Sequence, residues 1–165
     1  MDNKDLRTLI LSAGQINNEL TKIFGKIPSG LIPINGKPVI FRIIDKLLEE
    51  GIENISITVG YKKEVLQEIV SEQYKNQCEL NFIPTDYNKP PGNSIKTSIE
   101  NFKEKKLLII LGDTLINNNL IELIKKGKNF LFLIGGKILE VWLILVTYIM
   151  ILQNYMVVWQ SLINL

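Results

Sequence analysis

Short apolar runs alternate with amphipathic helical patterns from Arg7 to about Leu131, and this alternation constrains the fold more than any other feature of the sequence. The runs have the length and composition of strands that are buried on both faces. The expected strands are 8–11, 54–59, 79–83 and 107–111, with a weaker one near 130–134. Strands separated by helices predict βαβ units with right-handed crossovers. We therefore expect an α/β fold with a mainly parallel, doubly wound sheet, which carries helices on both faces.

The clearest helical pattern runs from Val39 to Glu50. Its apolar residues fall on one face and its charged residues on the other, as in a helix that packs on a sheet. Pro38 precedes this helix and Gly51 follows it, which is the usual asymmetry of helix termini. The other expected helices are about 63–74, a segment that carries Ile95 and Ile99 inward with Asn93 or Ser94 as its cap, and about 118–126.

Two strands end in residues suited to a ligand. The first leads into Gly14, where the absence of a side chain lets the backbone approach a phosphate or a sugar. The fourth leads into Asp113, which brings a carboxylate to the same edge of the sheet if the two strands are parallel. Each residue alone also fits ordinary turn chemistry. Together they predict a metal-assisted nucleotide site.

Two long connections interrupt the alternation of strands and helices. One runs from residue 14 to 38, and the other, rich in proline, from 84 to 93. Long loops inside a compact domain are usually functional or disordered. Both follow strands, so we expect both at the edge of the sheet that carries Asp113.

Composition excludes several kinds of chemistry. Lys and Arg total 19 against 17 Asp and Glu, and this small positive charge does not indicate nucleic-acid binding. There is no His, so histidine acid–base catalysis and histidine metal ligation are excluded, and a metal would be held by oxygen ligands that favour Mg²⁺. Cys78 is the only cysteine, and we expect it as a small buried apolar residue. The charged first five residues lack the apolar stretch of a signal peptide, which predicts a cytoplasmic protein.

Four segments in this order resemble the sugar-phosphate nucleotidyltransferases, also called nucleotide-sugar pyrophosphorylases. They are Leu11-Ser12-Ala13-Gly14, the stretch from Ile27 to Ile40, Pro91-Gly92-Asn93-Ser94 and Leu111-Gly112-Asp113. The resemblance covers about residues 7–128, so it implies a truncated, N-terminal part of a Rossmann-like, glycosyltransferase-A-like nucleotidyltransferase fold. It also implies an activity, the transfer of a nucleotidyl group from a nucleoside triphosphate to a sugar 1-phosphate with release of pyrophosphate.

The resemblance carries roles over to individual residues. It implies that Asp113 holds Mg²⁺ and that six residues bind the nucleotide, namely Leu11, Ala13, Gly14, Pro91, Gly92 and Asn93. The family's usual Gly-x-Gly-Thr-Arg loop is here 14–18, Gly-Gln-Ile-Asn-Asn, and its usual Pro-Lys pair is Pro28-Ser29, so two expected cations are missing. Lys22 and Lys26 lie in the same loop and are the candidates to replace them as catalytic cations, with a plain surface role as the alternative.

The character of the chain changes after about Leu131. We therefore divide it into a nucleotide-binding domain, 1–131, and an apolar C-terminal tail, 132–165, which has no charged residue from 141 onward. Three interpretations compete. The tail is a strand or helix of the core, a membrane helix preceded by lysines, or the product of a coding frame disrupted near residue 131. We favour the third, because composition and turn signals change together, whereas Gln153, Asn154 and Gln160 argue against a membrane span.

The tail affects the expected function, because the acceptor-sugar half of the family's site would normally follow residue 131. Our first hypothesis is the nucleotidyltransferase reaction. The alternatives are a non-catalytic remnant that binds a nucleotide or a nucleotide sugar, and a protein tethered to a membrane by its apolar C-terminus.

Overall fold

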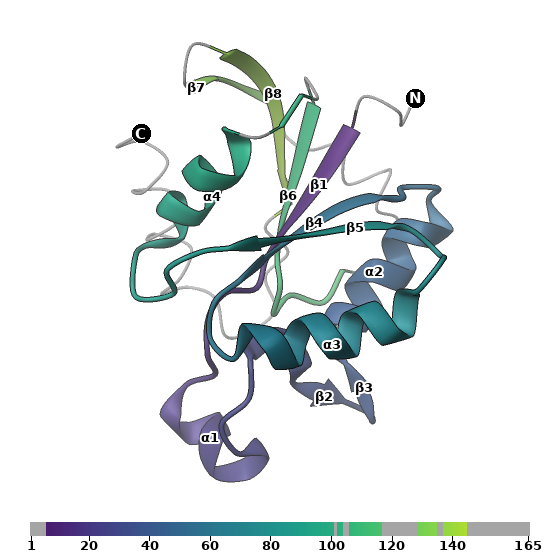
Figure 1. Ribbon diagram of the computed structural model, residues 1–165, viewed down its shortest axis with the longest axis vertical. Helices are drawn as coiled ribbons and strands as arrows, with labels where there is room; N and C mark the ends of the chain where they lie inside the picture. Colours follow the sequence, from purple (N-terminus) through teal and green to yellow (C-terminus); the bar gives the residue numbers. More distant parts are fainter. Residues whose placement is uncertain (1–5, 101, 104–105, 117–128, 135–136, 145–165) are drawn as a thin grey trace.

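The chain folds as an α/β protein around one six-stranded sheet (Figure 1). The computed structural model describes residues 6–100, 102–103, 106–116, 129–134 and 137–144. The strand order is β5-β4-β1-β6-β8-β7. The strands are β1 (Leu6–Leu11), β4 (Asn54–Val59), β5 (Glu79–Pro84), β6 (Lys106–Leu111), β7 (Asn129–Ile134) and β8 (Lys137–Ile144). The predicted fold class is confirmed.

The register of the central strands positions the functional edge. β1 pairs in parallel with β4 on one side and with β6 on the other, so that Leu11 lies opposite both Thr58 and Leu111. β4 and β5 are parallel, β6 and β8 are parallel, and β7 alone is antiparallel to its neighbour among the described strands of this sheet. The carboxyl ends of β1, β4 and β6 therefore meet at one edge, as the sequence predicted.

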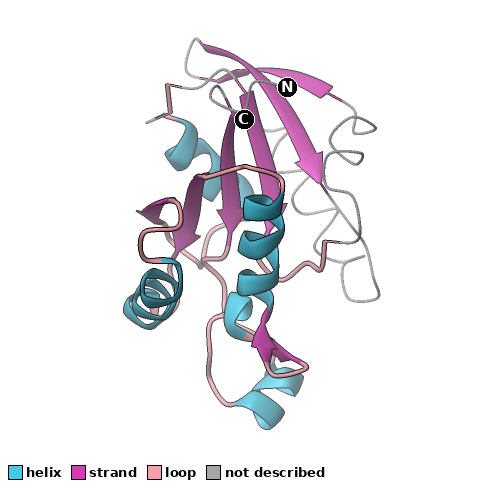
Figure 2. Cartoon of the chain, turned by 90° about the vertical axis from the view of Figure 1, so that its right-hand side faces the viewer, coloured by secondary structure: helices cyan, strands magenta, loops and turns pink. Residues whose placement is uncertain are grey.

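Helices cover both faces of the sheet (Figures 1 and 2). α2 (Val39–Glu49) and α3 (Lys63–Tyr74) lie on one face and α4 (Pro91–Ile99) on the other. A large core cluster joins α2 and α3 to alternate residues of β1, β4 and β6, and a second, smaller cluster joins Ile95 and Ile99 of α4 to the opposite residues. Because both faces of the sheet are covered, β6 is apolar at every position from Leu107 to Leu111.

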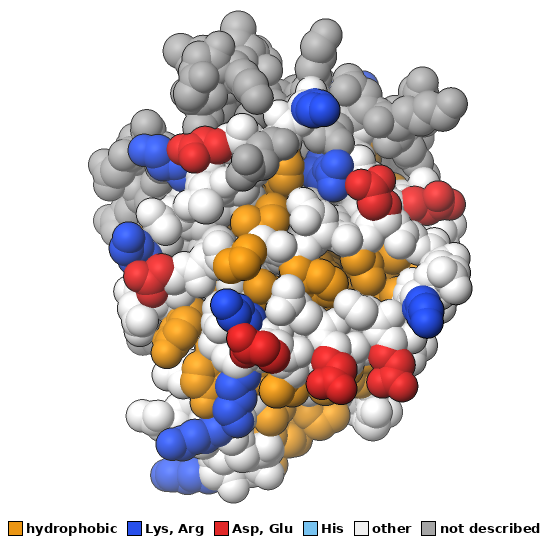
Figure 3. Space-filling view, in the orientation of Figure 1, with side chains coloured by type: hydrophobic (Ala, Val, Ile, Leu, Met, Phe, Trp, Pro, Cys, Tyr) orange, Lys and Arg blue, Asp and Glu red, His pale blue; other side chains and the backbone are white. Residues whose placement is uncertain are grey.

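The local sequence of α2 explains its position. Ile40, Ile43, Ile44 and Leu47 are fully buried, at the spacing of one helical face. Pro38 forms the N-cap, and Gly51, with φ +70°, follows the C-cap. α3 packs beside it through an edge-to-face contact of Tyr74 with Phe41. The outer side of α3 carries the exposed Glu64, Glu68 and Glu72, and acidic side chains gather over α3 in Figure 3.

Three shorter elements lie outside the sheet. They are α1 (Asn18–Phe24), the 3₁₀ turn η2 (Ser29–Leu31) and a two-stranded ribbon of β2 (Pro33–Ile34) and β3 (Lys37–Pro38). None of these was predicted.

The predicted caps of α4 were wrong, because this helix begins at Pro91 with Pro90 as its N-cap, where a missing backbone N–H costs nothing. Cys78 is partly buried against the larger core cluster.

The C-terminal strands cross the expected domain boundary. β7 spans residues 131 and 132, and β8 extends the sheet beside β6 as far as Ile144. The start of the apolar run, 141–144, is thus the end of a strand, whereas 145–165 and the helix expected at 118–126 lie outside the described residues. No described helix is long and apolar enough for a membrane crossing. The domain division and the disrupted frame stay predictions.

Candidate functional site

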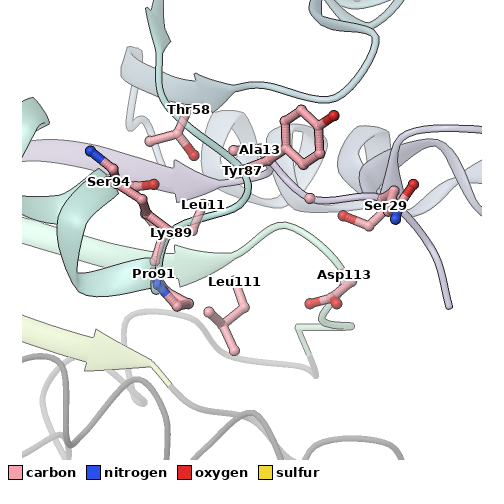
Figure 4. A pocket seen from close by; sticks show the side chains of 12 residues that line it. Leu11, Ala13, Ser29, Thr58, Tyr87, Lys89, Pro91, Ser94, Leu111 and Asp113 are labelled. Carbon is pink, nitrogen blue, oxygen red and sulfur yellow. The ribbon is translucent and has the colours of Figure 1, made fainter.

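A cleft of about 230 Å³ opens at the carboxyl ends of β1, β4 and β6 (Figure 4). Residues from all three strand ends and from both long connections line it. They are Leu11, Ala13, Gly14, Gln15, Ser29, Thr58, Tyr87, Lys89, Pro91, Ser94, Leu111 and Asp113. The position matches the rule that open α/β sheets bind ligands outside the carboxyl ends of their strands.

Gly14 presents bare backbone to this cleft. A Cβ atom on Gly14 would have nothing within 4 Å, so the space beside its Cα is open. The Gly14 carbonyl accepts a hydrogen bond of 3.1 Å from the Ser29 backbone N–H, and Gln15 forms a bridge with Pro28. These contacts tie the start of the first long connection to its middle, beside the open backbone.

Gly60 allows the residues that follow three strands to lie close together. The Tyr61 N–H donates to the Ala13 carbonyl at 2.8 Å, and the Thr85 N–H donates to the Val59 carbonyl at 2.8 Å. A Cβ on Gly60 would come within 2.8 Å of the Ala13 oxygen and within 3.0 Å of the Thr85 oxygen. Only glycine fits this close approach, which brings the exits of β1, β4 and β5 together.

Asp113 supplies the carboxylate of the cleft. Asp113 as a whole is exposed to solvent. Neighbouring protein atoms nevertheless displace enough water from its carboxyl group to raise the pKa of that group above the ordinary value. A hydrogen bond from its own backbone N–H acts in the opposite direction on this pKa and is weaker. Gly112 anchors the turn, because its N–H donates to the Leu11 carbonyl at 2.8 Å.

The carboxylate fits one mode of magnesium binding. Within the described ranges, no three acidic or cysteine side chains gather closely enough to enclose a metal ion. Mg²⁺ bound with a nucleotide needs only one or two carboxylates, because phosphate oxygens and water complete its coordination. Asp113 at the edge of an open cleft suits this shared mode and does not suit a closed metal cage.

The structure brings together five of the predicted site residues and leaves four outside the cleft lining. Leu11, Ala13, Gly14, Pro91 and Asp113 line one cleft. Gly92 is buried in the first turn of α4, and the Asn93 N–H donates to the Pro90 carbonyl, so both lie beside the lining. Lys22 is in the last turn of α1, and the Lys26 carbonyl accepts from the Lys62 ammonium at 2.7 Å. The roles assigned to all nine stay predictions.

Sequence reasoning missed several lining residues, of which Lys89 and Tyr87 matter most. Lys89 is the one cation that lines the cleft in the part of the chain that the structure describes. Its place directly before Pro90 and Pro91, which fix the start of α4, was the available signal. Tyr87 lies two residues earlier in the same loop, and Figure 4 shows its ring near Ala13.

Together, the doubly wound sheet and the strand-end cleft define an α/β protein with a ligand cleft at the carboxyl edge of its parallel strands. The family model described as nucleotidyl transferase matches residues 7–131. The chain therefore belongs to the nucleotidyl transferase family.

Relatives and solved structures agree with this family. The chain is 25% identical to the UTP–glucose-1-phosphate uridylyltransferase AglF of Haloferax volcanii over 74% of this chain and 49% of that protein. It is 25% identical to a D-glycero-alpha-D-manno-heptose 1-phosphate guanylyltransferase of Aneurinibacillus thermoaerophilus over 73% of this chain and 52% of that protein. The chain thus spans about half the length of these relatives.

Among solved structures, HddC from Yersinia pseudotuberculosis complexed with GMP-PN has a similar fold. The TM-score is 0.60 with 24% identity, over 73% of this chain and 53% of that chain. The CTP:phosphocholine cytidylyltransferase LicC from Streptococcus pneumoniae gives a TM-score of 0.55 with 28% identity, over 70% of this chain and 48% of that chain. The predicted resemblance, limited to the N-terminal part of the family, is confirmed.

Proposed function

We propose that this chain binds a nucleoside triphosphate with Mg²⁺ and transfers its nucleotidyl group to a sugar 1-phosphate. One observation carries the proposal. Gly14, Pro91 and Asp113, which are far apart in the sequence, line a single cleft at the carboxyl edge of parallel strands. The relatives named as sugar-1-phosphate uridylyl- and guanylyltransferases support the substrate class.

The reaction asks the protein mainly for positioning. A phosphate oxygen of the sugar 1-phosphate forms a bond to the α-phosphorus, the bond from that phosphorus to the bridging oxygen breaks, and pyrophosphate leaves. The bare backbone at Gly14 gives room for the nucleotide, and the side chains of Ser29 and Lys89 line the cleft. Asp113 would hold Mg²⁺, which offsets phosphate charge when bound.

A second candidate function is nucleotide binding without turnover. The chain spans about half of its relatives, and Lys89 is the one cation among the described lining residues. Loss of a charge-stabilising group from such a site typically lowers the rate by roughly 10²-fold or more. A chain that keeps the cleft but lacks those groups would bind the nucleotide and turn it over slowly or not at all.

Two measurements on the full chain distinguish these functions. Calorimetric titration with each of the four common nucleoside triphosphates and Mg²⁺ tests binding. Release of pyrophosphate from the same nucleotides, with glucose 1-phosphate and other sugar 1-phosphates, tests turnover. Binding with turnover supports the transferase, binding alone supports the second candidate, and absence of both contradicts the proposed function.

The apolar tail has its own test. We propose that it arose by disruption of the coding frame near residue 131, and the other two frames of the neighbouring nucleotides can be translated directly. A continuation resembling the sugar-binding half of the family would support this origin. Its absence from both frames would contradict it.

A further inference from the structure

An aromatic ring stands at the mouth of the cleft with a large exposed surface. Tyr87 lies in the loop between β5 and α4, lines the cleft, and is 44% exposed. Keeping an aromatic side chain in water forgoes the free energy that its burial would provide. Exposed aromatic side chains beside a cleft are therefore candidates for ligand contact, provided that the protein holds them in place.

Tyr61 packs against Tyr87. The two rings meet edge to face, with their centroids 5.6 Å apart and an interplanar angle of 76°. The backbone is close as well, because a Cβ on Gly60 would lie 3.0 Å from the Cβ of Tyr87. The Tyr61 ring in turn lies under the Lys62 ammonium, 5.9 Å from its centroid.

Hydrogen bonds fix the loop that carries Tyr87. The Asp86 carboxylate accepts from the Asn88 backbone N–H at 3.0 Å and from its side-chain amide at 3.2 Å. The Asp86 carbonyl accepts from the Lys89 N–H at 3.2 Å, which closes a turn around Tyr87. A ring on a fixed turn loses little conformational entropy when a ligand binds to it.

The side chains near this ring are suited to a flat, partly apolar group. In the view of Figure 4, Tyr87 lies with Ala13 and Thr58 along one side of the cleft, and Pro91 and Leu111 lie along the other. Asp113 is set apart from Pro91 and Ser94 along the cleft in the same view. The cleft thus has a carboxylate at one end, and Pro91 and Leu111 lie across it from the aromatic ring.

We propose that Tyr87, supported by Tyr61, is a stacking surface for the base of the nucleotide. This inference rests on the proposed function, since it assigns the base to a particular side chain of the same cleft. Stacking on an aromatic ring accepts every base, because each base has a π-face, so Tyr87 contributes affinity for the base and little choice among bases.

The test compares ligands with and without a base. The probes are the four nucleoside triphosphates and inorganic tripolyphosphate, each titrated with Mg²⁺ into the full chain. Tyr87→Ala is expected to weaken all four nucleotides by roughly tenfold and to leave tripolyphosphate unchanged. Tyr87→Phe keeps the ring and is expected to bind like the original chain. Val65→Ala is the control, because Val65 is 42% exposed on α3 and does not line the cleft.

Tyr87→Leu guards against a folding defect in the alanine variant, because it keeps an apolar side chain without a π-face. It is expected to bind the nucleotides more weakly than Tyr87→Phe. Unchanged nucleotide binding by the Ala or Leu variant would overturn the role of Tyr87 and leave the proposed function standing. Equal losses for nucleotides and tripolyphosphate would overturn it too. If the original chain binds no nucleotide, both proposals fail.

Discussion

Gly112 lies so close to Ser12 that a Cβ on Gly112 would come within 2.7 Å of the Ser12 Cβ. This contact joins the turns that follow β1 and β6, which carry Gly14 and Asp113 to the same cleft. The Ser12 residue is itself buried, and its N–H donates to the Thr58 hydroxyl at 3.0 Å, so it has little room to move.

Gly112→Ala is therefore expected to destabilise the fold. Forcing a methyl group into a packed site typically costs about 1–3 kcal/mol, and the strain falls on the turn that positions Asp113. Urea unfolding measures the loss of stability, and nucleotide titration measures the effect on the cleft. A variant with unchanged stability and binding would show that the two turns separate easily.

Gly14→Ala is the matched substitution in open space. Its φ lies outside the left-handed region and nothing lies within 4 Å of the new methyl group, so the free energy of unfolding should change by less than about 0.5 kcal/mol. Nucleotide affinity should fall by roughly fivefold to tenfold, because the added methyl group takes up the room that the nucleotide needs beside Gly14. Calorimetric titration checks the affinity, and unaltered binding would place the nucleotide away from Gly14.

Asp113→Asn is expected to remove the dependence of nucleotide binding on Mg²⁺. In the unsubstituted protein, Mg²⁺ should strengthen nucleotide binding most at pH values above the raised pKa of Asp113. This effect of Mg²⁺ should decline as the pH falls through that pKa, because a protonated carboxyl group is a poor metal ligand. The raised pKa also means that ionisation of Asp113 opposes folding, so the variant should be no less stable at neutral pH. Titrations at several pH values, with and without Mg²⁺, test both statements. A Mg²⁺ effect that persists in the variant would exclude Asp113 as the ligand.

Lys89→Gln is expected to weaken nucleoside triphosphate binding by roughly fivefold at low salt and to reduce its salt dependence. The reason is that Lys89 lines the cleft and a triphosphate is strongly anionic. Lys22→Gln and Lys26→Gln are the comparisons, since these were the cations expected from the sequence and neither lines the cleft. Larger losses in those two variants than in Lys89→Gln would restore the original assignment.

Tyr74→Phe tests a contact that supports the fold away from the cleft. The Tyr74 hydroxyl lies 2.7 Å from an Asp45 carboxylate oxygen and 2.9 Å from the Phe41 carbonyl. Burial and the neighbouring Asp45 carboxylate raise the pKa of Tyr74 above its ordinary value. The variant should lose about 1.5–3 kcal/mol of stability at neutral pH, the usual contribution of a hydrogen bond to a charged group.

The pH dependence of the same pair has a definite sign. An unfolded tyrosine loses its proton near pH 10, whereas folded Tyr74 keeps it, so the original chain should lose stability as the pH rises above about 10. Tyr74→Phe should show a shallower decline in that range. Denaturation curves of both proteins at pH 8 to 11 measure this difference. Equal losses of stability in the two proteins over this range would show that the pKa of Tyr74 is not raised.

The sequence predicted those parts of the fold whose signal is local. α2 was found because Ile40, Ile43 and Ile44 repeat at helical spacing between Pro38 and Gly51, and all three are buried. α1 was missed because it buries none of its residues, so no apolar stripe marks it, although Asn17 caps it by accepting from the Leu20 N–H at 2.8 Å. β8 was missed because its apolar end, 141–144, continues in the sequence into a longer apolar run with no Gly or Pro to mark a strand boundary.

The site, too, could be predicted only where its signal is local or follows from the order of strands and helices. The convergence of Gly14 and Asp113 follows from parallel strands, which the regular alternation of strands and helices already implied. The places of Tyr87 and Lys89 depend on contacts between separate loops. Tyr61 and Gly60, which support the Tyr87 side of the cleft, are more than twenty residues away, and no periodic pattern connects them.

The bridge of Gln15 with Pro28 leaves α1 outside the core, although Ile16 and Ile27, at the two ends of the segment between them, pack inward. α1 contributes nothing to the interior, and Ser29 holds Gly14 whatever length of chain separates them. Insertions, deletions or grafted sequences between residues 17 and 27 should therefore leave the sheet and its neighbours intact. A surface segment of this kind can change in length or sequence without a matching change in the sheet that carries it.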